Sequence, residues 1–127
     1  MSSQVPSDLL YAKSHEWARV QDGVATVGIT DHAQHELTDI VFVELPAKGR
    51  QVHVGEACAV VESVKTASDI YSPVAGEVIE TNPAVVNDPS LVNTAPYTNG
   101  WFFRVRLTEG APSGLLSPAD YGAQIGA

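Results

Sequence analysis

The stretch ACAVVESVKTASDIYSPVAGEV, residues 57–78, decides the fold of this chain of 127 residues. An apolar, strand-like run, ACAVVE, leads up to SVKT, and a second strand-like run, ASDIYSP, leads away from it. Two such runs on either side of a short polar segment predict a β-hairpin with Lys65 near its tip. The predicted turn contains no Gly, Pro or Asn, so local turn chemistry alone does not place it.

Lys65 is one of three lysines in the chain, and it lies among the carboxylates of Glu62, Asp69 and Glu77. A lone lysine in a polar turn is usually a solvated charge that contributes little to stability. Unlike arginine, however, lysine can be acylated, and acylation removes its positive charge. An exposed lysine on a stiff hairpin is therefore a suitable post for a covalently attached arm. The nearby acids are then suited to recognition by the enzyme that attaches the arm.

Short strands and turns dominate the rest of the chain. Residues 17–30, WARVQDGVATVGIT, alternate in polarity on both sides of Asp22-Gly23, a pair typical of tight hairpins. Further strand-like pieces are IVFVELP, QVHV, GEVIET and WFFRVRL. Residues 84–100 have no clear period and are predicted to form a long surface loop. This pattern predicts an all-β dominated fold, either a β-sandwich or a flattened barrel.

Two short helices are predicted beside the strands. The first lies near residues 31–38, where Thr30 or Asp31 can cap the first amide groups. The second is a short C-terminal helix that begins at Ser117-Pro118, with serine as the cap and proline in the first turn. Two glycines in this segment, at positions 122 and 126, are expected to weaken it.

Composition and charge exclude several classes of function. Fifteen acidic residues against seven basic ones give a net charge of −8, which argues against nucleic acid binding. No apolar run approaches the roughly 20 residues of a membrane span, so no membrane partner is predicted. The start of the chain, MSSQVPSDLLYAKSHEW, resembles neither a secretory signal nor a transit peptide, which predicts a cytoplasmic, bacterial protein. The length predicts a single domain over residues 1–127.

Other chemistry-bearing residues have simpler interpretations. His32 and His35 lie near several acids but lack the HExxH spacing of metalloproteases, so we expect surface or capping roles and no metal. The single cysteine, Cys58, lies in an apolar run and is predicted to be a buried small hydrophobe. No nucleophile elbow or phosphate loop is present, so the sequence predicts no enzyme active site. The aromatic residues Trp17, Trp101 and Phe103 are predicted to be core residues.

The segment around Lys65 resembles a known family. ESVKTASDIYSPVAGEV, residues 62–78, is similar to the lipoyl-lysine signature of the glycine cleavage system H proteins. Further segments resemble the same family in the same order: SHEW at 14–17, VGITDHAQ at 27–34, DIVFVELP at 39–46, LVN at 91–93, PY at 96–97 and GW at 100–101. The resemblance covers roughly residues 9–121. Biotin carriers normally have Met on both sides of the lysine, where this chain has Val64 and Thr66. Lipoyl domains of 2-oxoacid dehydrogenases lack the SHEW and ITDHAQ segments.

This resemblance implies a hybrid barrel-sandwich of the lipoyl/biotinyl type and a non-catalytic carrier with covalently attached (R)-lipoate. The implied partners are glycine decarboxylase (P protein), aminomethyltransferase (T protein), dihydrolipoyl dehydrogenase (L protein) and the lipoylating enzymes. The carrier would shuttle an aminomethyl group from the P protein to the tetrahydrofolate-dependent T protein, and the L protein would reoxidise it. Two alternatives stay open: an unmodified β-sandwich adaptor, and a lipoyl carrier or relay serving another pathway.

The resemblance also implies roles for particular residues of this chain. They are lipoyl attachment for Lys65, recognition by the modifying enzyme for Glu62 and Gly76, and docking of the loaded arm for Ser14, Glu16 and Asp69.

Overall fold

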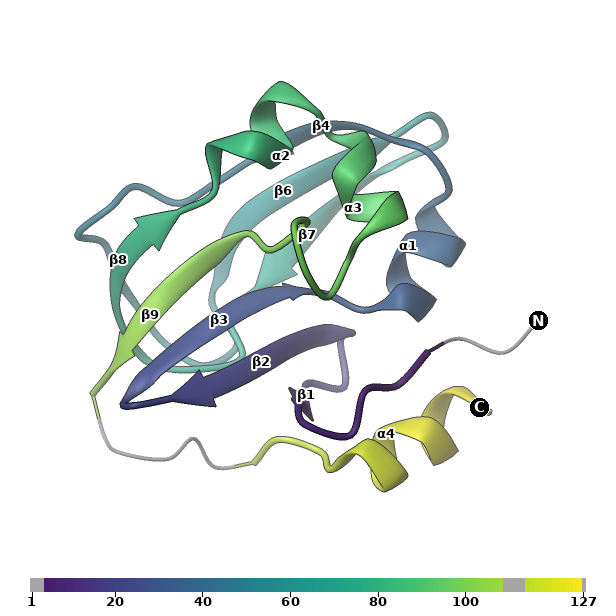
Figure 1. Ribbon diagram of the computed structural model, residues 1–127. Coiled ribbons are helices and arrows are strands. Elements are labelled where there is room, and N and C mark those ends of the chain that lie inside the picture. The colour runs from purple at the N-terminus through teal and green to yellow at the C-terminus, as the bar shows by residue number, and fades with distance from the viewer. Residues whose placement is uncertain (1–3, 109–113, 127) are drawn as a thin grey trace.

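The computed structural model describes residues 4–108 and 114–126, and strands dominate it (Figure 1). The strands are β1 (Leu10–Tyr11), β2 (Glu16–Gln21), β3 (Val24–Ile29), β4 (Ile40–Glu44), β5 (Gln51–Val52), β6 (Ala57–Ser63), β7 (Ala67–Tyr71), β8 (Gly76–Thr81) and β9 (Phe103–Leu107). The helices are α1 (Asp31–Leu37), α2 (Pro83–Asn87), α3 (Ser90–Thr94) and α4 (Pro118–Ile125). The prediction of an all-β dominated chain with short helices is confirmed.

The strands form two antiparallel sheets that enclose the core. The larger sheet has the order β1-β2-β3-β9-β8-β5, and the smaller one has the order β4-β6-β7. Figure 1 shows the smaller sheet behind and above the larger one. One buried cluster joins Val27 and Val105 of the larger sheet to Val61 and Ile70 of the smaller sheet. Alternating apolar residues on the inner faces therefore pack into a shared core, as in a sandwich.

The first hairpin and the first helix form where the local sequence predicts them. Asp22 and Gly23 have φ angles of 53° and 77°, the positive values that a tight two-residue turn requires. Thr30 is the N-cap of α1, and its side chain accepts a hydrogen bond of 3.2 Å from the amide of Ala33. Both predictions rest on contacts between residues close in sequence, and both are confirmed.

The prediction of a long surface loop at residues 84–100 is wrong, because this segment contributes to α2 and α3. Asn82 caps α2 by accepting a 3.2 Å hydrogen bond from the amide of Ala84. Val85 and Val92 are fully buried against the core. Each helix has five residues, too few for a helical period to appear in the sequence.

The C-terminal helix α4 is better supported than its glycines suggest. Ser117 accepts a hydrogen bond of 3.1 Å from the amide of Asp120, as predicted for the cap. Gly126 lies beyond the last helical residue in the left-handed conformation, with φ of 75°, so it ends the helix rather than weakening it. Tyr121 is fully buried in a second cluster with Tyr11 and Trp17.

The aromatic residues divide between core and surface. Trp17 and Phe103 are fully buried, which confirms their predicted place in the core. Trp101 is only partly buried, and the guanidinium of Arg104 lies 4.2 Å from its ring centroid. The prediction for Trp101 is confirmed only in part, because its side chain packs against the second buried cluster but also forms this cation–π contact at the surface. In the described part of the chain, no helix has the length and apolar character needed to cross a bilayer.

Candidate functional site

The predicted hairpin is present, and Lys65 lies at its tip. β6 and β7 are paired from Ala57 opposite Tyr71 to Glu62 opposite Ala67. Val64, Lys65 and Thr66 form the exposed connection. The hairpin reaches the end of the molecule that carries α1 and α3 (Figure 1).

The side chain of Ser63 supplies the turn chemistry that the sequence seemed to lack. The backbone amide of Ser63 donates a 2.7 Å hydrogen bond to the carbonyl of Thr66. Its hydroxyl oxygen accepts hydrogen bonds from the amides of Lys65 and Thr66, at 3.2 Å and 3.1 Å. The amide of Val64 donates to the carbonyl of Asp39 at 3.0 Å, which ties the tip to the segment before β4. A serine can fold a turn in this way without Gly or Pro, and its place two residues before Lys65 was the available signal.

The environment of Lys65 is compatible with an acylated arm. The residue is exposed, and no carboxylate among residues 4–108 and 114–126 forms an ion pair with its amine. Its backbone is nevertheless fixed by Ser63, so an arm attached to the amine would start from a defined position. A lipoyl group would be held by an amide bond to this amine.

The two residues assigned to recognition by the modifying enzyme lie in different sheets. Glu62 is exposed on β6, three residues before Lys65, where a protein that grips the hairpin can contact it. Gly76 begins β8 in the larger sheet and is paired with Val52 and Leu107. The structure therefore brings Glu62, but not Gly76, into the hairpin of Lys65.

A cleft of about 160 Å³ lies between β7, α1 and the segment before β2. Its walls include the polar residues Ser14, His15, Glu36 and Asp69 and the apolar residues Ile29 and Ile70. Asp69 belongs to the descending strand of the Lys65 hairpin. The cleft is thus adjacent to the strand that would carry the base of the arm.

Glu16 is buried beside this cleft and is hydrogen-bonded to one of its lining residues, Ser14, and to the backbone of β7. The hydroxyl of Ser14 donates a 2.5 Å hydrogen bond to one carboxylate oxygen of Glu16. The amide of Tyr71, two residues after Asp69, donates to the other oxygen at 3.1 Å. The structure therefore brings Ser14 and Asp69 into one cleft, and it places Glu16 in contact with Ser14 and with the backbone two residues after Asp69.

Burial controls the protonation of Glu16. The residue is only 1% exposed. This burial raises the pKa of its carboxyl group from 4.5 to about 7, even though the hydrogen bonds from Ser14 and Tyr71 favour the charged form. Near neutral pH, Glu16 can therefore take up or release a proton. A cation placed in the cleft would favour the carboxylate.

His15 is the member of the site that sequence reasoning missed. It lines the cleft between Ser14 and α1, and its Nδ1 lies 2.8 Å from the hydroxyl of Tyr121. Burial, followed by the neighbouring His32, lowers the pKa of the His15 imidazole. The sequence did carry a signal for His15, because it lies in the SHEW segment between Ser14 and Glu16. Both of these neighbours were assigned to docking of the loaded arm.

The two histidines of α1 and the cysteine have structural roles. His32 lies 3.1 Å from Glu36, and His35 lies 3.2 Å from Asp31, each one turn apart on α1. Within the described ranges, His, Cys, Asp and Glu side chains do not gather in threes as metal ligands would. Cys58 is buried as predicted, and burial raises the pKa of its thiol to about 11.

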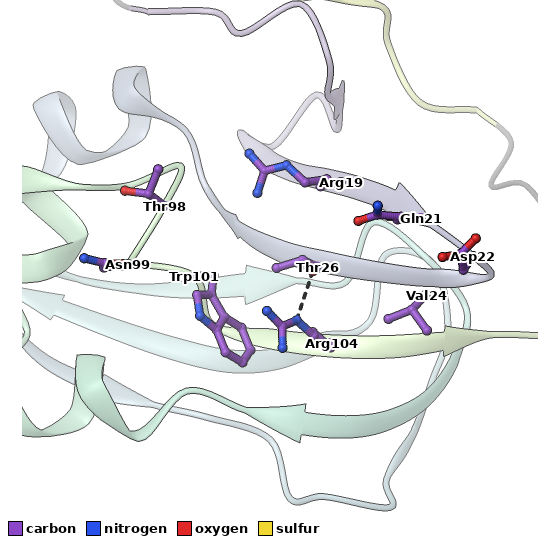
Figure 2. Close-up of a pocket in the computed structure, with 9 residues that line it drawn as sticks. All are labelled: Arg19, Gln21, Asp22, Val24, Thr26, Thr98, Asn99, Trp101 and Arg104. Atoms are coloured by element: carbon purple, nitrogen blue, oxygen red, sulfur yellow. Dashed lines mark hydrogen bonds between the residues drawn. The ribbon is translucent and has the colours of Figure 1, made fainter.

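A second, more open hollow lies elsewhere, on the outer face of the larger sheet (Figure 2). It measures about 570 Å³ and is flanked by Arg19, Trp101 and Arg104. Both arginines already have partners: Arg104 donates to Glu80 at 2.6 Å, and Arg19 donates to the carbonyl of Tyr97 at 3.1 Å. The hairpin and its cleft, rather than this hollow, are therefore the candidate site.

A two-sheet sandwich with an exposed lysine at a hairpin tip is the arrangement that the resemblance to carrier domains of the lipoyl class implies. The family model described as Glycine cleavage H-protein matches residues 9–125. The chain is 57% identical to the glycine cleavage system H protein of Alcanivorax borkumensis, over 97% of each chain. It is 54% identical to that of Streptomyces coelicolor, over 96% of this chain and 98% of the other. The chain therefore belongs to the glycine cleavage system H protein family.

A solved structure agrees with this assignment. The crystal structure of a glycine cleavage system H protein from Mycobacterium marinum superimposes with a TM-score of 0.91 at 41% identity, over 97% of this chain and 100% of the other. The predicted barrel-sandwich of the lipoyl type is thereby confirmed. Membership of this family gives the chain a carrier role in the glycine cleavage system.

Proposed function

We propose that this protein carries (R)-lipoate on Lys65 and shuttles an aminomethyl group from the P protein to the T protein. The observation that supports this most directly is the position of Lys65. It is exposed at the tip of a paired hairpin, where Ser63 fixes its backbone. The bound lipoyl group would supply a disulfide that accepts electrons and the aminomethyl cargo. The protein itself supplies the mount, the cleft and the surfaces that partners recognise.

The other components follow from the same proposal. Lipoylating enzymes attach the arm, with Glu62 in the hairpin as a recognition residue and Gly76 required for the fold around β8. The L protein reoxidises the arm after the T protein has taken the cargo. The carrier acts in the bacterial cytoplasm as a single domain and performs no catalysis alone.

We further propose that the cleft docks the cationic end of the loaded arm. An aminomethyl group bound to sulfur carries a protonated amine, which carboxylates and a hydroxyl bind well. Asp69 and Ser14 line the cleft, and Glu16 supports Ser14 from behind. While the amine remains protonated, its lone pair is not available to expel the sulfur, so docking protects the cargo.

Intact-mass measurement of protein from lipoate-competent cells tests the attachment site. The wild-type protein should gain the mass of one lipoyl group, and Lys65→Arg should gain none, because arginine cannot be acylated by this route. Lys48→Arg, which changes an exposed loop lysine, is the matched control and should be modified like the wild type. Unmodified wild-type protein would favour the adaptor alternative. A lipoylated protein that the P protein cannot load would favour a role in another pathway.

The docking role has a separate test. Glu16→Gln combined with Asp69→Asn should leave the lipoylation of Lys65 intact, since neither residue belongs to the hairpin tip. The double variant should lose its cargo several-fold faster in buffer without partners, measured as release of formaldehyde and ammonia. Equal release rates at equal loading would remove the docking role and leave the carrier role intact.

A further inference from the structure

The C-terminal helix reaches the arm cleft through one buried side chain, Tyr121. Its ring stacks on that of Tyr11, with centroids 4.6 Å apart and planes at 7°. Its hydroxyl oxygen lies 2.8 Å from Nδ1 of His15 and 2.7 Å from Oγ1 of Thr30. His15 lines the cleft, and Thr30 caps α1, which provides another wall. One phenol therefore joins two walls of the cleft to α4.

The direction of the hydrogen bonds around Tyr121 follows from the number of hydroxyl protons that are available to form them. Thr30 Oγ1 already accepts from the amide of Ala33, and its own proton has the Tyr121 oxygen as acceptor. If Thr30 donates to Tyr121, the phenol proton points to Nδ1 of His15, and every hydroxyl proton is used. The reverse direction would leave the Thr30 proton without an acceptor among the described residues. Buried hydroxyl groups rarely remain unpaired.

This arrangement makes Nδ1 of His15 an acceptor, so the ring is neutral and carries its proton on Nε2. The groups around the ring agree with a neutral form. His32 of α1 lies 4.8 Å away between ring centroids, and a second positive charge there would be unfavourable. Glu36 of α1 and Asp69 of β7 share the cleft walls and favour a positive charge. Burial and His32 outweigh them, because the pKa of His15 is lowered.

We propose that Tyr121 is a positioning residue of the arm cleft, whose hydroxyl donates to Nδ1 of His15 and holds that ring neutral in its Nε2–H form. This inference rests on the proposed docking of a cationic arm end. A protonated His15 would compete with the arm's amine for Glu36 and Asp69, the two carboxylates that line the cleft. A neutral ring leaves these carboxylates as the charges that face the cargo. His15 itself has a φ of 77°, in the left-handed region that few non-glycine residues adopt.

Tyr121→Phe removes the hydroxyl but keeps the ring that stacks on Tyr11. Nitrogen and carbon NMR of the His15 ring at neutral pH should show the Nε2–H tautomer in the wild type and a mixture of tautomers in the variant. Tyr11→Phe is the matched control, because its hydroxyl donates to the carbonyl of Pro6 and not to the cleft. An Nδ1–H tautomer in the wild type, or the same spectrum in Tyr121→Phe, would overturn the proposal.

The loaded protein gives a second readout. At equal loading, Tyr121→Phe should release formaldehyde and ammonia several-fold faster than the wild type, and Tyr11→Phe should release them at the wild-type rate. Equal rates for Tyr121→Phe and the wild type would contradict the positioning role. If Lys65 carries no lipoyl group even in the wild type, the proposed function fails, while the NMR measurement still decides the hydrogen bond.

A second variant covers the case in which Tyr121→Phe does not fold. Thr30→Val removes the hydroxyl that donates to Tyr121, and it should change the His15 spectrum in the same direction. Thr30→Ser keeps both the cap and the hydroxyl, so it should restore the wild-type tautomer. A wild-type spectrum for Thr30→Val would show that the chain of donors does not fix the ring.

Discussion

At the scale of the residue, Glu16 makes stability depend on pH. Its folded pKa is raised to about 7 by burial, above its ordinary value of 4.5. A raised pKa contributes stability that is fully present below the unfolded value and is lost as pH rises toward the folded value. Glu16 should therefore stabilise the fold at pH 4 and progressively less up to pH 7. A shift of this size corresponds to roughly 3 kcal/mol.

Urea unfolding of the wild type and Glu16→Gln at several pH values measures this contribution. Gln can keep both hydrogen bonds, accepting from the amide of Tyr71 and donating to the oxygen of Ser14. The variant should gain stability relative to the wild type as pH rises from about 5 to 8, by about 2 kcal/mol. A constant difference across this range would show that the carboxyl group titrates normally. Asp88→Asn, an exposed acid in the α2–α3 connection, is the control.

At the scale of the element, Gly76 is required by the contact between β8 and β9. Its φ is 154°, and a Cβ at this position would lie 2.0 Å from the carbonyl oxygen of Arg106. Since this neighbour is backbone, it can move only if the strands separate. Gly76→Ala should therefore destabilise the protein by on the order of 2 kcal/mol or more, measured by thermal or urea unfolding.

Gly49→Ala is the matched control for this prediction. Gly49 also has a positive φ, 93°, but a Cβ there would meet nothing within 4 Å. Its substitution should cost about 1 kcal/mol, the conformational term alone. If both variants unfold alike, the close approach to Arg106 is not the reason for glycine at position 76.

The sequence predicted the elements whose cause is local. The Asp22-Gly23 turn and the Thr30 cap of α1 each depend on residues within a few positions, and both were predicted. α2 and α3 were missed because five-residue helices show no period and depend on the burial of Val85 and Val92.

The site shows the same division between local and distant causes. The Lys65 hairpin could be predicted from its two flanking runs. The cleft could not be built from spacing, because it brings together Ser14 and Asp69, which are 55 positions apart in the sequence. Those residues entered only through the family resemblance. His15 and Tyr121, which are 106 positions apart, were not found at all.

At the scale of the whole molecule, the architecture separates the proposed mount of the arm from its proposed resting place. The hairpin belongs to the smaller sheet, whereas Ser14 and His15 lie in the connection between β1 and β2 of the larger sheet. The shared core holds the two sheets together, so the cleft stays at a fixed place relative to Lys65. Neither sheet alone contains the complete candidate site.

This division of labour predicts that the protein cannot cleave glycine by itself. Decarboxylation of an amino acid needs an electron sink, which a pyridoxal cofactor supplies in the proposed partner. The lipoylated protein with glycine and tetrahydrofolate should release no carbon dioxide above a blank without protein. Addition of the P protein should start the release and add the aminomethyl mass to the wild type, whereas Lys65→Arg should gain no such mass. Carbon dioxide from the carrier alone, well above the blank, would mean that this chain holds an active site of its own.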